Sequence, residues 1–201
     1  MRQIILSLVL LTFFQVGHSQ NVGGGLSAGF NTSQIDGDGF GGFYKVGASL
    51  GGYVYYDIFN NLRFQVDLLY DQVGSSWRNN EINYRVNYFS VPVLLNLNIP
   101  IQIGASEFEI GFHGGPSFGI LLGAEDVLNE QDFTDELNSL EVRMVGGGSF
   151  NFTERFAFLL RYGYSISNLA AGSPSSALFP ENVGPFNNVV TFSFRYELFT
   201  R

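Results

Sequence analysis

The segment "GPSFG", Gly115–Gly119, matches the G-x-S-x-G pattern that exposes a nucleophilic serine on a sharp turn. His113 lies two residues before it, so Ser117 and His113 are the candidate pair for a membrane hydrolase acting on lipid or peptide. That chemistry requires a strand followed by a helix in an α/β sheet, and no helical period follows this segment. The pattern therefore favours small residues within a β-strand, and we predict that the protein is not an enzyme.

Metal and cofactor chemistry has little support in the sequence. The chain has no cysteine and 2 histidines, which excludes thiolate and histidine-rich metal sites. The segment "DGDG", Asp36–Gly39, resembles part of a calcium loop but lacks the later glutamate ligand. We expect no cofactor. The acidic segment 124–137 is interpreted as a solvated loop, with a divalent ion or a protein contact as the alternative; its acids are Glu125, Asp126, Glu130, Asp132, Asp135 and Glu136.

A charge inside an apolar segment is the more informative feature. In "FAFLLRYGYSISNL", Phe156–Leu169, aromatic and aliphatic residues recur at every second position. This is the period of a β-strand, and it places Arg161 on the opposite face with small and polar residues. One face is thus apolar and the other is polar or charged.

Eight segments of the chain have this strand character. Each supplies the roughly 9–11 residues that a tilted strand needs to cross a bilayer. Their connections alternate between short and long, which is typical of an outer-membrane barrel with short periplasmic turns and long external loops. We predict an all-β fold, an eight-stranded antiparallel up-and-down transmembrane β-barrel. The segments are Val22–Asn31, Phe43–Tyr56, Leu62–Gly74, Tyr84–Leu97, Ser106–Phe118, Leu140–Phe152, Phe156–Ser167 and Asn188–Phe199.

The alternation alone also fits a soluble, lipocalin-like barrel, which would bury the apolar face and expose the charges. Aromatic crowding on the apolar face, the segregated loops and a single lysine, Lys45, favour the membrane barrel, whose apolar face contacts outer-membrane lipid. The charges must then line the lumen in a paired network. The predicted network contains Arg63, Asp67, Glu107, Glu109, Glu141, Arg143, Arg161, Arg195 and Glu197.

Two prolines interrupt the predicted strands. Proline cannot donate to a strand ladder, and a closed barrel has no edge strand to receive it. We therefore predict a β-bulge near Pro92 and another near Pro116. An ion-conducting path is a further alternative, although eight strands leave a lumen that side chains fill.

The start of the chain predicts export. Arg2, an apolar run from Ile4 to Phe14, and the small residues Gly17 and Ser19 form the pattern of a cleaved signal peptide over residues 1–19. The barrel domain would then cover residues 20–201. The net charge of −8, without a basic patch, argues against nucleic acid as a partner.

The order of several motifs resembles the PorT-type outer-membrane β-barrel family. They are the glycine-rich first strand ending at Asn31, "NYFSVPVLLNL", "GFHGGPSFGILL" and "FAFLLRYGYSISNL". The resemblance implies an eight-stranded barrel in the outer membrane of a Gram-negative bacterium, in a family whose namesake is associated with protein secretion. It carries over no catalytic residue. The expected function is an accessory of secretion or envelope assembly that acts through external loops, with a stand-alone structural barrel or adhesin as the alternative.

Overall fold

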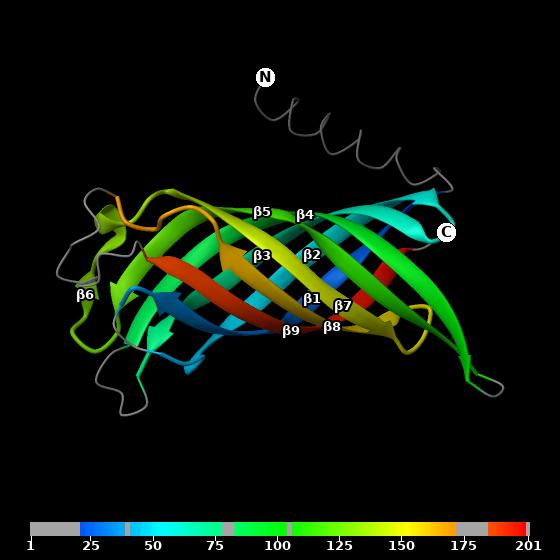
Figure 1. The fold of residues 1–201 in the computed structure, drawn as a ribbon, viewed down its shortest axis with the longest axis horizontal. Coiled ribbons are helices and arrows are strands. Elements are labelled where there is room, and N and C mark those ends of the chain that lie inside the picture. The colour runs from blue at the N-terminus through cyan, green and yellow to red at the C-terminus, as the bar shows by residue number, and fades with distance from the viewer. Residues whose placement is uncertain (1–20, 39–40, 78–82, 104–105, 172–184, 200–201) are drawn as a thin grey trace, which may run out of the picture.

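The alternating segments form eight long antiparallel strands that close into a barrel in the computed structural model, which describes residues 21–38, 41–77, 83–103, 106–171 and 185–199 (Figure 1). Closure is complete because β1 pairs with β9 and β4 pairs with β5. This confirms the predicted fold; the predicted signal peptide lies outside the described residues. The barrel strands are β1 (Val22–Asp36), β2 (Lys45–Phe59), β3 (Leu62–Ser76), β4 (Asn83–Ile103), β5 (Ser106–Asp126), β7 (Leu140–Asn151), β8 (Phe156–Ser165) and β9 (Phe186–Phe199).

The connections segregate to the two ends of the barrel. The end that carries residues 60–61, 104–105 and 152–155 between strands is called the short-turn end. The opposite, long-loop end carries the connections 37–44, 77–82, 127–139 and 166–185. Two small elements, β6 (Gln131–Asp132) and the 3₁₀ turn η2 (Thr134–Glu136), lie at the long-loop end, on the left of Figure 1.

Burial decides which face of the strands points inward. Arg161 is 6% exposed, whereas its neighbour Leu160 is 45% exposed, and Arg195 and Phe194 differ in the same way. The apolar set therefore covers the outside and the charges line the lumen, which is the arrangement of a membrane barrel and the reverse of a lipocalin-like one. Among the described residues, no helix has the length and apolar character to cross a membrane.

The strand pair β4–β5 is longer than predicted at the short-turn end. The segment "NIPIQIGA", Asn98–Ala105, was expected to be a turn, but β4 continues to Ile103. Its last pair with β3 is Leu97 with Leu62, and the backbone N–H of Asn98 donates to Asn61, so the strand beyond Asn98 has a free side. Pro100 is tolerated there because no neighbour on that side requires its N–H. The resulting hairpin projects beyond the other turns (Figure 1).

The register at the two internal prolines corrects the predicted bulges. Pro92 lies opposite Ser117, and the pairs on both sides of Pro92 keep one register with β5. Pro116 likewise pairs with Met144 of β7 without a shift. The ladder is interrupted around the prolines but gains no extra residue. Pro92 and Pro116 occupy nearly facing positions on adjacent strands. The register shift between β4 and β5 lies instead between Asn87 and Tyr88.

The seam between the first and last strands includes a glycine contact as close as those at several other strand pairs of the barrel. A Cβ atom at Gly29 of β1 would lie 2.0 Å from the backbone oxygen of Phe192 on β9. Only glycine allows this approach, because any other residue would collide with backbone rather than with a movable side chain.

Candidate functional site in the lumen and at the long-loop end

The centre of the lumen is filled by one aspartate between two arginines. Arg161 of β8 and Arg195 of β9 both contact Oδ2 of Asp67, at 3.0 Å and 2.8 Å. Gln65 donates to the other oxygen of Asp67 and accepts from Arg195 at 3.0 Å. Asp67 is 0% exposed, so its charge is stable only with these partners. We call this group the inner charge layer.

A second polar group lies nearer the long-loop end. Arg143 of β7 lies 3.3 Å from Glu141 and 3.6 Å from Asp71 of β3, and it donates to Ser90 at 3.0 Å. The guanidinium also lies 5.9 Å from the ring centre of Tyr88. These side chains are all nearly fully buried. We call this group the outer charge layer, and together the two layers cross the middle of the barrel.

The remaining predicted network residues lie outside these layers. Arg63 pairs with Asp57 at 2.6 Å, near the short-turn end. Glu109 accepts from Asn151, and Glu197 accepts from the hydroxyl of Tyr55. The side chain of Glu107 lies outside the described part of the structure.

Several partners of the charged residues lie outside the predicted network. Asp71, Asp57 and Gln65 were not included in the predicted network, although each shares the strand face of Asp67 or pairs with a residue that does. Asp71 is four positions after Asp67, and therefore points the same way. That spacing was the available signal.

The candidate hydrolase pair is separated by strand geometry. Ser117 and His113 both belong to β5 and are buried in the lumen. Four residues of strand separate them by about 13 Å, far beyond hydrogen-bond reach. His113 instead accepts from Nε of Arg161 at 3.3 Å, so it belongs to the inner charge layer.

The long-loop end is closed by an apolar cluster. Phe133 and Leu137, from the connection between β5 and β7, are 4% and 6% exposed, and they pack with Leu169 and with Val73, Val86 and Tyr88 of the barrel wall. The ring of Phe133 meets Tyr84 edge-on at 5.5 Å between centroids. This closure extends the filled lumen to the rim.

Two connections are joined to make this closure. The backbone N–H of Asn138 donates to Leu169 at 2.7 Å, and that of Ala171 donates to Glu136 at 2.8 Å. The side chain of Asn138 adds bonds to the carbonyls of Asn168 and Ala170, at 2.9 and 3.0 Å. We call residues 127–139 together with 166–171 the mouth cover.

The mouth cover presents an acidic surface. Glu130, Asp132, Asp135 and Glu136 are exposed. The hydroxyl and backbone N–H of Thr134 hold the pKa of the Asp132 carboxyl below its usual range, which keeps it charged. Among the described residues, no group of three or more histidine, cysteine, aspartate and glutamate side chains has the arrangement of a metal site.

Comparison with known proteins supports this architecture. The family model described as "Outer membrane protein beta-barrel domain" matches residues 15–171. The chain belongs to this family. An outer-membrane location follows from membership of the family, and it agrees with the apolar outer surface of the strands.

Several solved structures are similar to this family member. Ail, the attachment invasion locus protein of Yersinia pestis, has a TM-score of 0.52 and 15% identity, over 90% of this chain and 100% of that chain. Neisserial surface protein A has a TM-score of 0.46 and 15% identity, over 89% and 97% of the two chains. OprG from Pseudomonas aeruginosa has a TM-score of 0.42 and 14% identity, over 92% and 99%. The likeness to Ail establishes the fold alone. No curated protein matches the chain in sequence.

Proposed function

We propose that this protein is a non-catalytic outer-membrane barrel whose working surface is the mouth cover, facing the cell exterior. The observation that carries the proposal is the construction of that surface. Two connections are hydrogen-bonded to each other and anchored by buried Phe133 and Leu137, so their acidic side chains are presented on a fixed frame. A fixed frame reduces the conformational entropy lost on binding.

The proposed role is that of an accessory in protein secretion or envelope assembly. The order of motifs that resembles the PorT-type family supports this role, and so does a cover whose four exposed acids suit a partner with a basic surface. Membership of the PorT-type branch is part of the proposal. The barrel then serves as the anchor, and the signal peptide predicted over residues 1–19 accounts for export.

A stand-alone adhesin is the second candidate. Its support is the shared fold with Ail, an attachment invasion locus protein, at a TM-score of 0.52. An adhesin would use the same mouth cover but would have no stable partner in its own membrane.

A copurification experiment separates the two roles. The tag is placed at the end of the mature chain, the outer membrane is extracted in mild detergent, and recovered proteins are identified and quantified. The test variant is Glu130→Gln/Asp132→Asn/Asp135→Asn/Glu136→Gln, and the control is Glu154→Gln, an exposed acid at the short-turn end.

We expect secretion or envelope proteins at constant stoichiometry with the wild type and the control, and their loss with the quadruple variant. Recovery of the barrel alone from wild-type membranes would contradict the accessory role and favour the adhesin. Equal recovery with the quadruple variant would show that the acidic surface is not the contact.

A further inference from the structure

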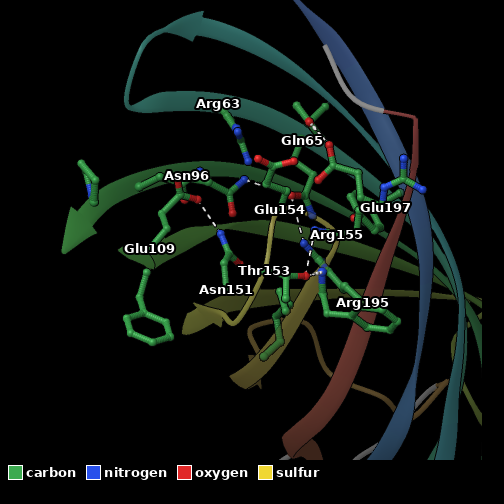
Figure 2. A pocket seen from close by; sticks show the side chains of 18 residues that line it. Arg63, Gln65, Asn96, Glu109, Asn151, Thr153, Glu154, Arg155, Arg195 and Glu197 are labelled. Carbon is green, nitrogen blue, oxygen red and sulfur yellow. Dashed lines mark hydrogen bonds between the residues drawn. The ribbon is translucent and has the colours of Figure 1, made fainter. Parts of the chain in front are cut away.

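The lumen contains a cavity at the short-turn end that the charge layers leave open. Its volume is about 470 Å³, within the range of roughly 300–1,000 Å³ typical of small-ligand sites. Arg195 and Gln65 of the inner charge layer line it, together with the rings of Tyr53 and Tyr55. Figure 2 shows Arg63, Asn96, Glu109 and Asn151 gathered on one side of this space, with Arg195 and Glu197 across from them.

Arg63 presents an unused guanidinium fork to this cavity. Its Nε donates to Asp57 at 2.6 Å, and its guanidinium carbon lies 4.5 Å from the ring centre of Tyr55. Its two terminal NH₂ groups have no acceptor among the described residues. A planar fork held in place by Nε and a tyrosine ring is suited to bind a carboxylate through two parallel hydrogen bonds.

Amide side chains supply the second half of the site. Asn98 is 6% exposed and lines the cavity, and its side-chain amide makes no hydrogen bond to the part of the chain that the structure describes. Asn96 uses only its NH₂ group, in a bond of 3.3 Å to Gln65, so its carbonyl oxygen is free. These free amide groups are open to the cavity and can bind another hydrogen-bonding molecule, and a peptide group matches both their donor and their acceptor.

The charges of the wall select among anions. Three carboxylates, Glu109, Glu154 and Glu197, line the cavity together with three arginines, Arg63, Arg155 and Arg195. The wall therefore has no excess of positive charge, which suits a singly charged carboxylate better than a phosphate with up to two charges. The cavity therefore favours a ligand with one carboxylate and adjacent amide groups.

We propose that this cavity binds the carboxyl-terminal end of a short or extended peptide, which enters from the short-turn end. Arg63 holds the terminal carboxylate, Asn96 and Asn98 bind peptide groups, and the rings of Tyr53 and Tyr55 form the wall. The inner charge layer closes the far end, so the ligand is retained rather than conducted. The site lies at the opposite end of the barrel from the mouth cover, so it goes beyond the proposed function and each can fail without the other.

The test uses the mature protein folded in detergent and a defined probe. N-acetyl-trialanine with a free carboxylate is compared with the same peptide ending in an amide, by calorimetry or NMR titration. A bidentate arginine–carboxylate contact contributes about 1.5–3 kcal/mol, so we expect the amide to bind at least about tenfold more weakly. We expect Arg63→Gln to lose a similar factor for the free acid only.

Two further variants separate recognition from folding. Asn98→Leu should weaken both peptides by about the same factor, because it removes a contact to the peptide groups rather than to the carboxylate. The control is Arg85→Gln, which removes an arginine at the long-loop end, where Arg85 pairs with Glu125 at 2.8 Å, and it should change neither affinity. Each variant is used only after its gel mobility shows the folded form before boiling and the shifted form afterwards.

Several results would overturn the proposal. Equal affinity of the two peptides in the wild type would exclude carboxylate recognition without any variant. Absence of binding by both peptides at about 50 mM would exclude the site, because even weak specific binding has a Kd near 1 mM. Displacement by inorganic phosphate at lower concentration than by acetate would show that the cavity prefers a different anion.

Discussion

Asp67 on β3 and Arg195 on β9 meet across the lumen at 2.8 Å, although 128 positions separate them in the chain. Their strands are not neighbours in the sheet, because β2 and β1 lie between them. This ion pair therefore spans the interior of the barrel and does not join neighbouring strands. A single aspartate neutralises two arginines, and this determines how much stability is lost when each of the three residues is replaced.

This sharing predicts an asymmetric cost of substitution. Asp67→Asn leaves Arg161 and Arg195 buried without a counter-charge, and we expect a loss of about 3–5 kcal/mol in the free energy of unfolding. Arg161→Gln leaves Asp67 paired with Arg195, so its cost should be smaller, about 1–3 kcal/mol. Urea unfolding in lipid vesicles measures both.

The matched control for these variants is Arg85→Gln. Arg85 and Glu125 form an ion pair whose side chains are 37% and 47% exposed, so its loss should cost no more than about 1 kcal/mol. Equal costs for Asp67→Asn and Arg161→Gln would contradict the shared-aspartate account.

Closure of the barrel should depend on Gly29. Its added Cβ atom would lie 2.0 Å from the backbone oxygen of Phe192, so Gly29→Ala should force apart the pairing of β1 and β9. We expect that little of the Gly29→Ala protein runs at the folded position on a gel before boiling and shifts after it. At Gly41 an added Cβ atom meets nothing within 4 Å, so Gly41→Ala is the control and should fold like the wild type. Normal folding of Gly29→Ala would show that the seam can widen at no cost.

The mouth cover should loosen when its apolar anchor is removed. Phe133 is 4% exposed, and Phe133→Ala removes a buried ring whose loss costs up to about 3–5 kcal/mol. We expect cleavage by a glutamate-specific protease within residues 127–139 to accelerate by about tenfold or more. Leu128→Ala changes a side chain of the same connection that is 45% exposed, and its cleavage rate should match the wild type. Equal rates for the two variants would mean that the anchor does not hold the cover.

The filled lumen predicts the absence of a stable ion path. Two charge layers and the apolar cluster around Phe133 occupy successive levels between the short-turn cavity and the rim. Purified protein in a planar bilayer should show no steady single-channel current at 100 mV. A current of constant size in the wild type, absent when the membrane holds no protein, would contradict this prediction and restore the narrow channel.

Much of this architecture follows from the two-residue period. The alternation around Arg161 and Arg195 predicts which face each strand buries, and the structure agrees because a strand cannot turn one side chain without turning the next. The ion-pair partner of each inward-facing charge cannot be predicted from this alternation. Asp67 meets Arg195 only through the curvature and register of four strands, and neither is encoded in a short segment.

Two features that the sequence prediction did not include have particular causes. Ile99 and Ile101 continue the strand alternation of β4 through Pro100, within the segment predicted to be a turn. Proline fits in this strand because no strand lies on the side to which its N–H would point. Phe133 and Leu137 lie four positions apart in a segment dominated by acids. The exposed acids agree with the predicted solvated loop, and the spacing of these two apolar residues was the sign that the loop is also anchored.

The seam between β1 and β9 also orders events during folding. Asn31 and Thr191, hydrogen-bonded across it, are 160 positions apart, so their contact closes a loop that contains most of the chain. Loop-closure entropy rises only slowly with length, but contacts of such long range form late and slow the reaction. Until then Asp67 faces no arginine of β9, and its carboxylate must keep its hydration. The barrel therefore closes around water, and expulsion of that water belongs to the last step of assembly.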